Sequence, residues 1–243
     1  MQHRLVRRVL GPGLAFVASL VLVASILMRG ALDGYVTHAA QAPAAVALTF
    51  DDGLNRDYTE AIADVLDQHG VRGTFFVVGQ TLGPQRALAE RLVLGGHLLA
   101  NHSYSHPHPS TMDVRYAELA RAQEAFAATI GRCPRFFRPP WGQETAFMKA
   151  AVRRAGLQTV MWDVEVADWD ERNPQRLAER VLERVRPGSV ILLHDGREGT
   201  PGADRSVQLA ALPLVLDGLA SRGLKPVTLG ELLGGSGYLE TCR

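Results

Sequence analysis

Short apolar runs and amphipathic stretches alternate along most of this chain. Apolar runs such as GTFFVV at 73–78 and SVILL at 189–193 predict buried strands, and apolar positions three or four residues apart predict helices. Strands are predicted at 46–50, 73–78, 97–100, 135–138, 157–162, 189–193 and 225–228. Helices are predicted at 57–69, 84–94, 113–130, 144–155, 174–185 and 203–222, the third with Asp113 as its N-cap.

The order of these elements predicts an α/β fold. Strands that are separated by helices of about ten or more residues pair in parallel through crossovers. The seven predicted strands indicate a distorted (β/α)7-type barrel, and an open doubly wound sheet is the alternative. In both folds, active-site residues follow the carboxyl ends of the strands.

The N-terminal segment has a different pattern. Arginines at positions 4, 7 and 8 precede residues 9–28, which carry no charged side chain and are long enough to cross a hydrocarbon core of roughly 30 Å. We expect an uncleaved anchor in the cytoplasmic membrane, with the arginines inside and the rest of the chain outside. The alternative is a cleaved signal peptide and a secreted protein, although its best cleavage pattern, at 40–42, lies far beyond Met28.

Charge and cysteine content narrow the classes of partner. With 26 basic and 25 acidic residues the net charge is +1, whereas nucleic-acid-binding domains carry a marked basic excess. No protein partner is implied either. Cys133 and Cys242 form no CxxC pair, which argues against a cysteine-based zinc site. They form a disulfide, which export would permit, or remain two free thiols.

Polar residues with catalytic chemistry follow the predicted strands. Any one of them is compatible with an ordinary turn or surface position. Because the carboxyl ends of parallel strands meet at one edge of the sheet, we expect the set to gather there as an active site. The residues are Asp51, Asp52, His102, His106, Arg138, Glu165, Asp168, His194 and Asp195.

Two of these histidines suit a metal ion. The segment HSYSH at 102–106 places two imidazoles four residues apart, where both can face one ion. A carboxylate from the first strand end completes a set of three ligands and leaves a position for water, as in catalytic zinc sites. We expect a divalent metal, with zinc first and cobalt or another transition metal as alternatives. Of Asp51 and Asp52, one would bind the ion and the other accept a proton, and spacing does not decide which.

Five segments identify a family resemblance. They are TFDDG at 49–53, HSYSH at 102–106, RPPWG at 138–142, EVADW at 165–169 and LLH at 192–194. They occur in the order of the five motifs of the NodB-like polysaccharide deacetylases, carbohydrate esterase family 4. The sequence resembles this family from about residue 46 to residue 233.

The resemblance implies a role for each matching position. Asp51 is similar to the catalytic base and Arg138 to the arginine that orients it. Asp52, His102 and His106 resemble the metal ligands. His194 resembles the general acid, which agrees with our expectation that a histidine near carboxylates stays protonated.

Three further positions resemble substrate-binding residues. Trp141 stands where the family usually has tyrosine, and the backbone N–H at this position stabilises the oxyanion. Trp169 is similar to the tryptophan that lines the sugar groove, and Leu192 to the apolar floor of that groove.

One position departs from the family pattern. Glu165 stands where aspartate is usual, and the resemblance implies that this carboxylate tunes the acid His194. Asp163, on the same face of an extended strand, is a possible substitute. His69, His97 and His108 are expected to be structural or surface residues.

The resemblance implies hydrolysis of N-acetyl groups on an acetylated amino-sugar polymer. Export favours a cell-envelope or extracellular glycan, with peptidoglycan first and chitooligosaccharide second. Alternatives are an O-acetyl esterase of the xylan type and a non-catalytic glycan-binding protein. The expected organisation is a cytoplasmic stub and membrane segment at 1–29, a linker at 30–45, the catalytic NodB homology domain at 46–233 and a tail at 234–243.

Overall fold

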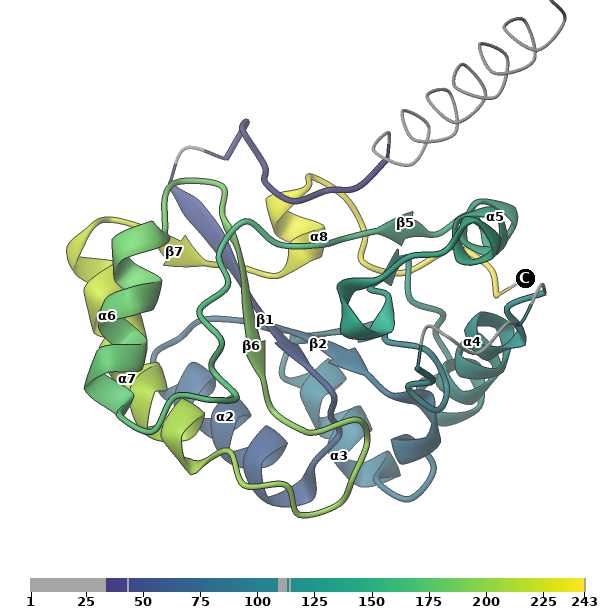
Figure 1. Cartoon of the computed structure of the whole chain (residues 1–243), viewed down its shortest axis with the longest axis horizontal. Coiled ribbons are helices and arrows are strands. Elements are labelled where there is room, and N and C mark those ends of the chain that lie inside the picture. The colour runs from purple at the N-terminus through teal and green to yellow at the C-terminus, as the bar shows by residue number, and fades with distance from the viewer. Residues whose placement is uncertain (1–33, 43, 109–112, 114, 243) are drawn as a thin grey trace, which may run out of the picture. The chain divides into compact units, whose positions relative to one another are not determined.

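Figure 1 shows a computed structural model of the chain, which describes residues 34–42, 44–108, 113 and 115–242. The compact unit that contains the sheet begins at Tyr35. The predicted membrane anchor at 9–28 lies outside the described residues. Among the helices that are described, none has the length and apolar character needed to cross a membrane.

In the described part of the chain, seven parallel strands form one sheet. They are β1 Ala45–Asp51, β2 Thr74–Val77, β3 Leu98–Asn101, β4 Phe136–Phe137, β5 Gln158–Thr159, β6 Val190–His194 and β7 Lys225–Pro226. Their order is β5-β4-β3-β2-β1-β6, and β7 pairs with the start of β1. A doubly wound sheet reverses its strand order at a switch point, whereas here the strands from β1 to β5 are successive neighbours.

The sheet curls back on itself. Val164, beyond the end of β5, forms a parallel bridge with Ile191 of β6. The backbone N–H of Leu192 then donates to the carbonyl oxygen of Val164 at 2.9 Å. The segment after β5 therefore reaches β6, which is consistent with the predicted barrel and argues against the open alternative.

The helices connect the strands around the outside of this sheet (Figure 1). They are α2 Arg56–Gln68, α3 Arg86–Leu94, α4 Ala117–Ile130, α5 Ala146–Ala155, α6 Pro174–Arg184, α7 Ser206–Ser221 and α8 Leu229–Leu232, with 3-10 turns at η1 Gly79–Thr81 and η2 Pro140–Gly142. The sequence pattern predicted all of the longer helices to within a few residues. It did not predict the single turn of α8.

The start of α4 differs from the prediction of a helix from residue 113. Tyr116 has a left-handed φ of 48°, so the helix begins only at Ala117. Asp113 still acts as a cap, because its carboxylate accepts the backbone N–H of Ala117 at 2.7 Å and that of Arg115 at 2.9 Å. The sequence identified the capping residue but not the turn between the cap and the helix.

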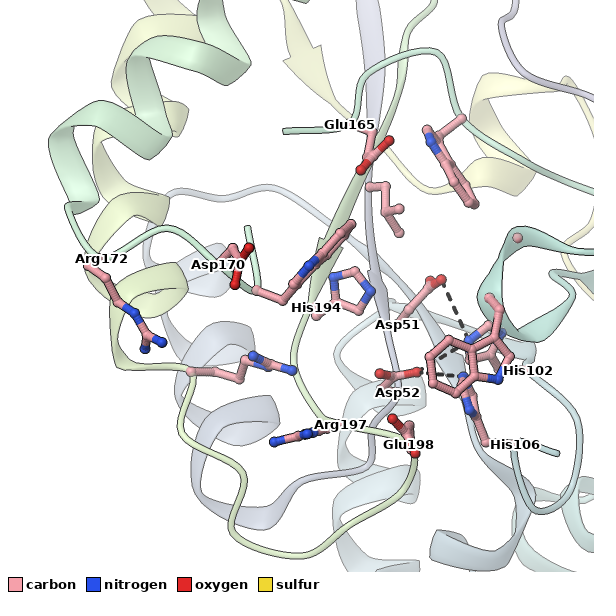
Figure 2. A pocket seen from close by; sticks show the side chains of 16 residues that line it. Asp51, Asp52, His102, His106, Glu165, Asp170, Arg172, His194, Arg197 and Glu198 are labelled. Carbon is pink, nitrogen blue, oxygen red and sulfur yellow. Dashed lines mark ion pairs between the residues drawn. The ribbon is translucent and has the colours of Figure 1, made fainter. Parts of the chain in front are cut away.

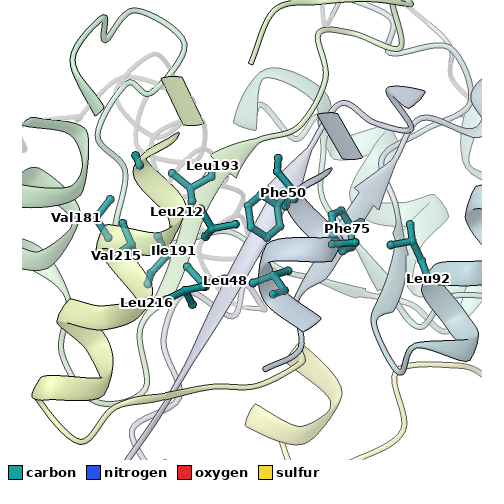
Figure 3. Close-up of a cluster of buried hydrophobic side chains, with 14 of the residues drawn as sticks. Leu48, Phe50, Phe75, Leu92, Val181, Ile191, Leu193, Leu212, Val215 and Leu216 are labelled. Atoms are coloured by element: carbon teal, nitrogen blue, oxygen red, sulfur yellow. The ribbon is translucent and has the colours of Figure 1, made fainter. Parts of the chain in front are cut away.

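Side-chain alternation along the strands separates a core from a functional face. Leu48 and Phe50 of β1 pack with Ile191 of β6 and with Leu212 and Leu216 of α7 (Figure 3). Burial of each such side chain stabilises the fold by about 1.5–3 kcal/mol. This core fixes the strands against the outer helices.

The same alternation turns the last side chains of the strands to the opposite face. In β1, Thr49 and Asp51 alternate with the core residue Phe50, and in β6 the alternating positions are Leu192 and His194. Asp51 and His194 are also partners in the parallel register. The register therefore brings together two candidate catalytic side chains that are far apart in the sequence.

Both ends of the described chain are attached to the domain. Val36 pairs with Val160, and His38 pairs with Ser189. The prediction of a linker extending to residue 45 is therefore wrong from Tyr35 onward, because this segment bonds to backbone groups near the ends of the sheet.

A disulfide holds the C-terminal tail. It joins Cys133 to Cys242, with the Cα atoms 5.3 Å apart, and so decides between the two alternatives that the sequence left open. Tyr238 in the same tail forms an antiparallel bridge with Pro134. The tail predicted at 234–243 thus packs on the domain where it is described.

Candidate active site

The side chains that follow the strands meet in one cleft of about 650 Å³. Figure 2 shows acids and histidines from separate elements pointing into it. Asp51 and His194 end β1 and β6, and His102 directly follows β3. The cleft also contains Asp52 and His106, so the expected gathering at one edge of the sheet is present.

Asp52, His102 and His106 form a cluster that could hold a metal ion. Oδ1 of Asp52 lies 3.3 Å from Nε2 of His102 and 3.1 Å from Nε2 of His106. All three residues are buried, and their candidate ligand atoms lie within 4.8 Å of one another. No second group of this kind occurs among the residues that the structure describes.

Hydrogen bonds orient the imidazoles of this cluster. Nδ1 of His102 lies 2.8 Å from the carbonyl oxygen of Arg138, so Nδ1 is the donor and Nε2 is left to face Asp52. The backbone N–H of His106 donates to Oγ of Ser103 at 3.0 Å. Burial disfavours the charged form of Asp52, but the hydrogen bonds and charges of the two histidines hold its pKa well below the usual range. An ionised carboxylate here suits a cation.

Arg138 holds Asp51 in a fixed orientation. Nη1 of this fully buried arginine donates to Oδ1 of Asp51 at 2.6 Å and to Oγ1 of Thr49 at 2.9 Å. Its Nε and Nη2 donate to the carbonyl oxygens of Val160 and Met161 at 3.1 and 3.0 Å. A buried ion pair with its remaining donors satisfied is costly to break, since either partner alone would be a buried unpaired charge.

Asp168 raises the pKa of His194. Its two carboxylate oxygens accept the ring Nδ1–H and the backbone N–H of His194, both at 2.8 Å. Burial by itself lowers the pKa of His194, but the charge and hydrogen bond of Asp168, followed by the charges of Asp52 and Asp51, raise it to about 9. The imidazole is therefore protonated at neutral pH.

The prediction that Glu165 or Asp163 lies against His194 is wrong. Glu165 is exposed and lines the cleft without touching the histidine ring. Asp163 accepts the backbone N–H of Val190 at 2.8 Å and contacts Nδ1 of His38 at 3.1 Å. The prediction assumed an extended strand to residue 162, whereas β5 ends at Thr159.

A turn after β5 instead presents Asp168 to His194. Ala167 has a left-handed φ of 49°, which reverses the chain directly before Asp168. The carbonyl oxygen of Asp168 also accepts Nε2–H of Gln208 at 2.7 Å, which ties this turn to α7. The sequence placed Asp168 among the polar residues after the strands, but it gave no signal for this turn.

Two exposed tryptophans border the polar centre. The Trp141 ring lies 5.3 Å from that of His106, and the Trp169 ring lies 5.2 Å from that of His194. About 47% of Trp141 and 44% of Trp169 remain exposed, while Leu192 is buried beneath the same cleft. The residues expected to contact substrate therefore all line the cleft.

Asp195 supports the first aspartate loop, a role that sequence reasoning did not assign. Its buried carboxylate accepts the backbone N–H of Gly53 at 3.1 Å and the hydroxyl of Thr59. A Cβ atom on Gly53 would lie 2.2 Å from this carboxylate, so only glycine fits. Burial raises the pKa of Asp195 to about 7, against the lowering effect of the Thr59 hydroxyl. In the sequence, its position directly after His194 is the feature that could have pointed to a role in the site.

The other histidines have the expected positions outside the metal cluster. Nδ1 of the buried His97 accepts the backbone N–H of Gly73 at 3.1 Å. His69 contacts the carbonyl oxygen of Val65 through Nδ1 at 2.7 Å. His108 lies beside the cleft, with its ring 5.5 Å from that of Trp141.

The fold and site define a class of protein: a curled parallel α/β sheet whose carboxyl edge carries a candidate metal cluster, a paired aspartate and a protonated histidine. A family model described as polysaccharide deacetylase matches residues 38–160. The chain belongs to this family and is a polysaccharide deacetylase, a hydrolase of carbon–nitrogen bonds other than peptide bonds. The resemblance seen in the five motifs is thereby confirmed.

Individual relatives act on related glycans. The chain is 36% identical over 196 residues to a chitooligosaccharide deacetylase of Bradyrhizobium sp. (strain ANU 289), covering 77% of this chain and 90% of the relative. It is 33% identical over 191 residues to a peptidoglycan-N-acetylglucosamine deacetylase of Bacillus cereus, covering 78% and 68%. The crystal structure of the Bc1960 peptidoglycan N-acetylglucosamine deacetylase matches with a TM-score of 0.78 and 31% identity, over 85% of this chain and 95% of that one.

Proposed function

We propose that this enzyme is a metal-dependent hydrolase that removes N-acetyl groups from N-acetylglucosamine-type residues of a cell-envelope or extracellular glycan. Peptidoglycan is the first candidate and chitooligosaccharide the second, and acetate is the second product. The observation that carries the proposal is the meeting of Asp52, His102 and His106 with Asp51 and His194 in one open cleft. The activities named for the relatives support the same bond and the same sugar.

The donor set fits a divalent transition metal. Two imidazole nitrogens and one carboxylate oxygen suit zinc, or cobalt as the alternative, better than magnesium or calcium. Asp52, His102 and His106 would hold the ion and leave positions open for water and substrate. When bound, the ion supplies Lewis-acid chemistry, which acidifies water and polarises the acetamide carbonyl.

Asp51 is the proposed base. Arg138 holds its Oδ1, while its Oδ2 lies 3.7 Å from Nε2 of His102 and so faces the ligand cluster. From this position Asp51 can accept a proton from the water that attacks the acetamide carbon. The backbone N–H of Trp141 is proposed to stabilise the oxyanion that forms on the carbonyl oxygen.

His194 is the proposed acid. The contacts of Asp168 keep its imidazole protonated, and the ring lies in the same cleft as the proposed base. As the carbon–nitrogen bond breaks, His194 donates its Nε2 proton to the departing amine, and acetate remains. Trp169 and Leu192 are proposed to hold the sugar ring through their apolar surfaces.

We also propose that the enzyme is anchored in the cytoplasmic membrane through residues 9–28, with the catalytic domain outside. The uncharged stretch after three arginines supports this proposal. The Cys133–Cys242 disulfide adds support, because structural disulfides persist in oxidising compartments. Protease treatment of intact spheroplasts should degrade the catalytic domain. A domain that survives the treatment would lie inside the membrane and would contradict the proposal.

Acetate release by the full chain in detergent, loaded with Zn²⁺ or Co²⁺, tests the activity. Peptidoglycan, chitooligosaccharides and acetylated xylan are the substrates, and Asp51→Asn is the matched variant. We expect release from the N-acetylated glycans, and we expect the variant to lose it while retaining near one equivalent of metal. Release from xylan alone would replace the proposal with an O-acetyl esterase, and no release from any glycan would overturn it.

A further inference from the structure

Three arginines lie between the active-site cleft and a second cavity and line both. Arg172, Arg197 and Arg205 line both the active-site cleft and a neighbouring cavity of about 360 Å³. Figure 2 shows Arg172 and Arg197 on the side of His194 opposite to His106. The proposed deacetylation chemistry uses none of these three side chains.

Arg205 is a buried arginine without a close ion-pair partner among the described residues. Only 8% of this residue is exposed, and among the described residues Arg138 is the other buried arginine. Arg138 pairs with Asp51, whereas Arg205 has no carboxylate oxygen within ion-pair distance in the described part of the chain, and its charge acts only at longer range on Asp204. Its Nε donates to the carbonyl oxygen of Gly196 at 2.7 Å, which fixes the guanidinium at the cavity wall. Because Arg205 lines both cavities, its guanidinium can be reached by an anion that enters them.

The acids nearest to these arginines are engaged elsewhere. Glu171 accepts two hydrogen bonds from Arg176, at 2.8 and 2.5 Å. Asp204 accepts the Tyr58 hydroxyl and the Ser206 backbone N–H, both at 2.9 Å. Neither forms an ion pair with the arginines of the cleft within the described residues.

Three other acids outside the proposed catalytic centre, Glu165, Asp170 and Glu198, line the cleft with the arginines. None of these acids forms an ion pair with any of the three arginines in the described part of the chain. Arg172 and Arg197 therefore have no carboxylate within ion-pair distance among the described residues, and their donors are available to an anionic ligand in the cleft.

Backbone hydrogen bonds order the two loops that carry Arg172 and Arg197. The Gly199 N–H donates to the carbonyl oxygen of Asp52 at 3.1 Å, two residues after Arg197. On the other loop, Glu171 accepts the N–H of Arg172 at 2.8 Å. These contacts order the backbone on which Arg172 and Arg197 stand beside the cleft.

We propose that Arg172, Arg197 and Arg205 form a subsite for a carboxylate carried by the sugar next to the one that is deacetylated. The inference rests on the proposed function and narrows its substrate to anionic glycans. Guanidinium groups bind carboxylates through paired charge-assisted hydrogen bonds. A glycan strand whose muramic acids carry no stem peptide has a free lactyl carboxylate on every second sugar, whereas chitooligosaccharides are uncharged.

The test compares two tetrasaccharides of equal length with the metal-loaded full chain. One is the tetramer of N-acetylglucosamine, and the other alternates N-acetylglucosamine with N-acetylmuramic acid. The measured quantity is the ratio of kcat/KM for the carboxylated over the neutral substrate. We expect wild type to favour the carboxylated substrate, and the ratio to fall about tenfold in the Arg172→Gln/Arg197→Gln variant and with added salt.

Arg154→Gln is the matched control, because this exposed arginine lies on α5, away from both cavities. It should retain the wild-type ratio and activity. Arg205→Lys keeps a positive charge but loses the planar fork, so we expect an intermediate ratio. The inference is overturned if wild type treats the two substrates alike, or if the double variant keeps the wild-type ratio.

A binding arm separates this inference from the proposed function. Calorimetry with Asp51→Asn measures the affinity for both tetrasaccharides without turnover. If wild type releases no acetate from either sugar, the deacetylation proposal fails. The subsite still stands if Asp51→Asn binds the carboxylated sugar more tightly than the neutral one, and if adding Arg172→Gln/Arg197→Gln to this variant removes that preference. The subsite fails if Asp51→Asn binds both sugars equally.

Discussion

The contact between Asp168 and His194 gives the sharpest prediction. Asp168→Asn removes the negative charge that raises the pKa of His194 most, while burial, which lowers that pKa, remains. The rise of the pKa from 6.5 to about 9 corresponds to about 3 kcal/mol in favour of the imidazolium. Without the carboxylate we expect the pKa to fall to roughly 7 or below.

The sign of the effect on stability follows from the raised pKa. Asp168 stabilises the folded protein fully below pH 6.5, and this stabilisation is lost as the pH rises through about 9. The variant carries a second cost, because the carboxylate accepts two N–H groups of His194 and an amide has only one oxygen. One donor left without a partner costs about 1–3 kcal/mol.

The assay is a titration of the His194 ring nitrogens by two-dimensional NMR. It uses chelator-treated protein, since a cation at Asp52 would offset part of the negative charge that acts on the ring. Glu165→Gln is the control, and it should leave the pKa near 9 because Glu165 does not contact the ring. A pKa that stays near 9 in Asp168→Asn, or falls equally in Glu165→Gln, would refute the reasoning.

Three further changes test the metal cluster, the buried ion pair and the disulfide. His106→Ala removes a proposed ligand and should weaken zinc binding, as measured by calorimetry. The loss should exceed the roughly 10- to 100-fold that follows removal of a hydrogen bond to a ligand. An unchanged affinity would exclude this histidine as a ligand. Arg138→Met leaves Asp51 buried without its partner and should lower the free energy of unfolding in urea by about 3–5 kcal/mol, and a loss below 1 kcal/mol would contradict this. Cys133→Ser removes a crosslink over 109 residues and should lower the free energy of unfolding by about 2–5 kcal/mol. Reductant should lower the stability of wild type to that of the variant and leave the variant unchanged; an equal effect on both would contradict this.

The sequence alone determined the order and type of the elements and most members of the site. Alternating apolar runs and helical spacing are local signals, and they located strands ending at Asp51 and near His102 and His194. Parallel strands bring their carboxyl ends to one edge whatever the details of packing. The five motifs then identified the family, because each contains residues that work at that edge.

Only the tertiary structure decided which of these residues touch. The partner of His194 depends on the end of β5 and a left-handed turn at Ala167, so Asp168 and not Glu165 reaches the ring. The pairing of Cys133 with Cys242 joins positions 109 residues apart. Such contacts depend on the path of the whole chain in space, which local periodicity does not encode.

The same reason explains the segment from Tyr35 and the buried state of Arg205. A stretch rich in alanine and glycine has the composition of a linker, yet Val36 pairs with Val160, more than a hundred positions later in the sequence. Arg205 has the charge of a surface residue, and its burial follows from the close packing of the loop before α7 against Gly196. Composition reports what a residue prefers, while burial and partners are set by what the fold brings next to it.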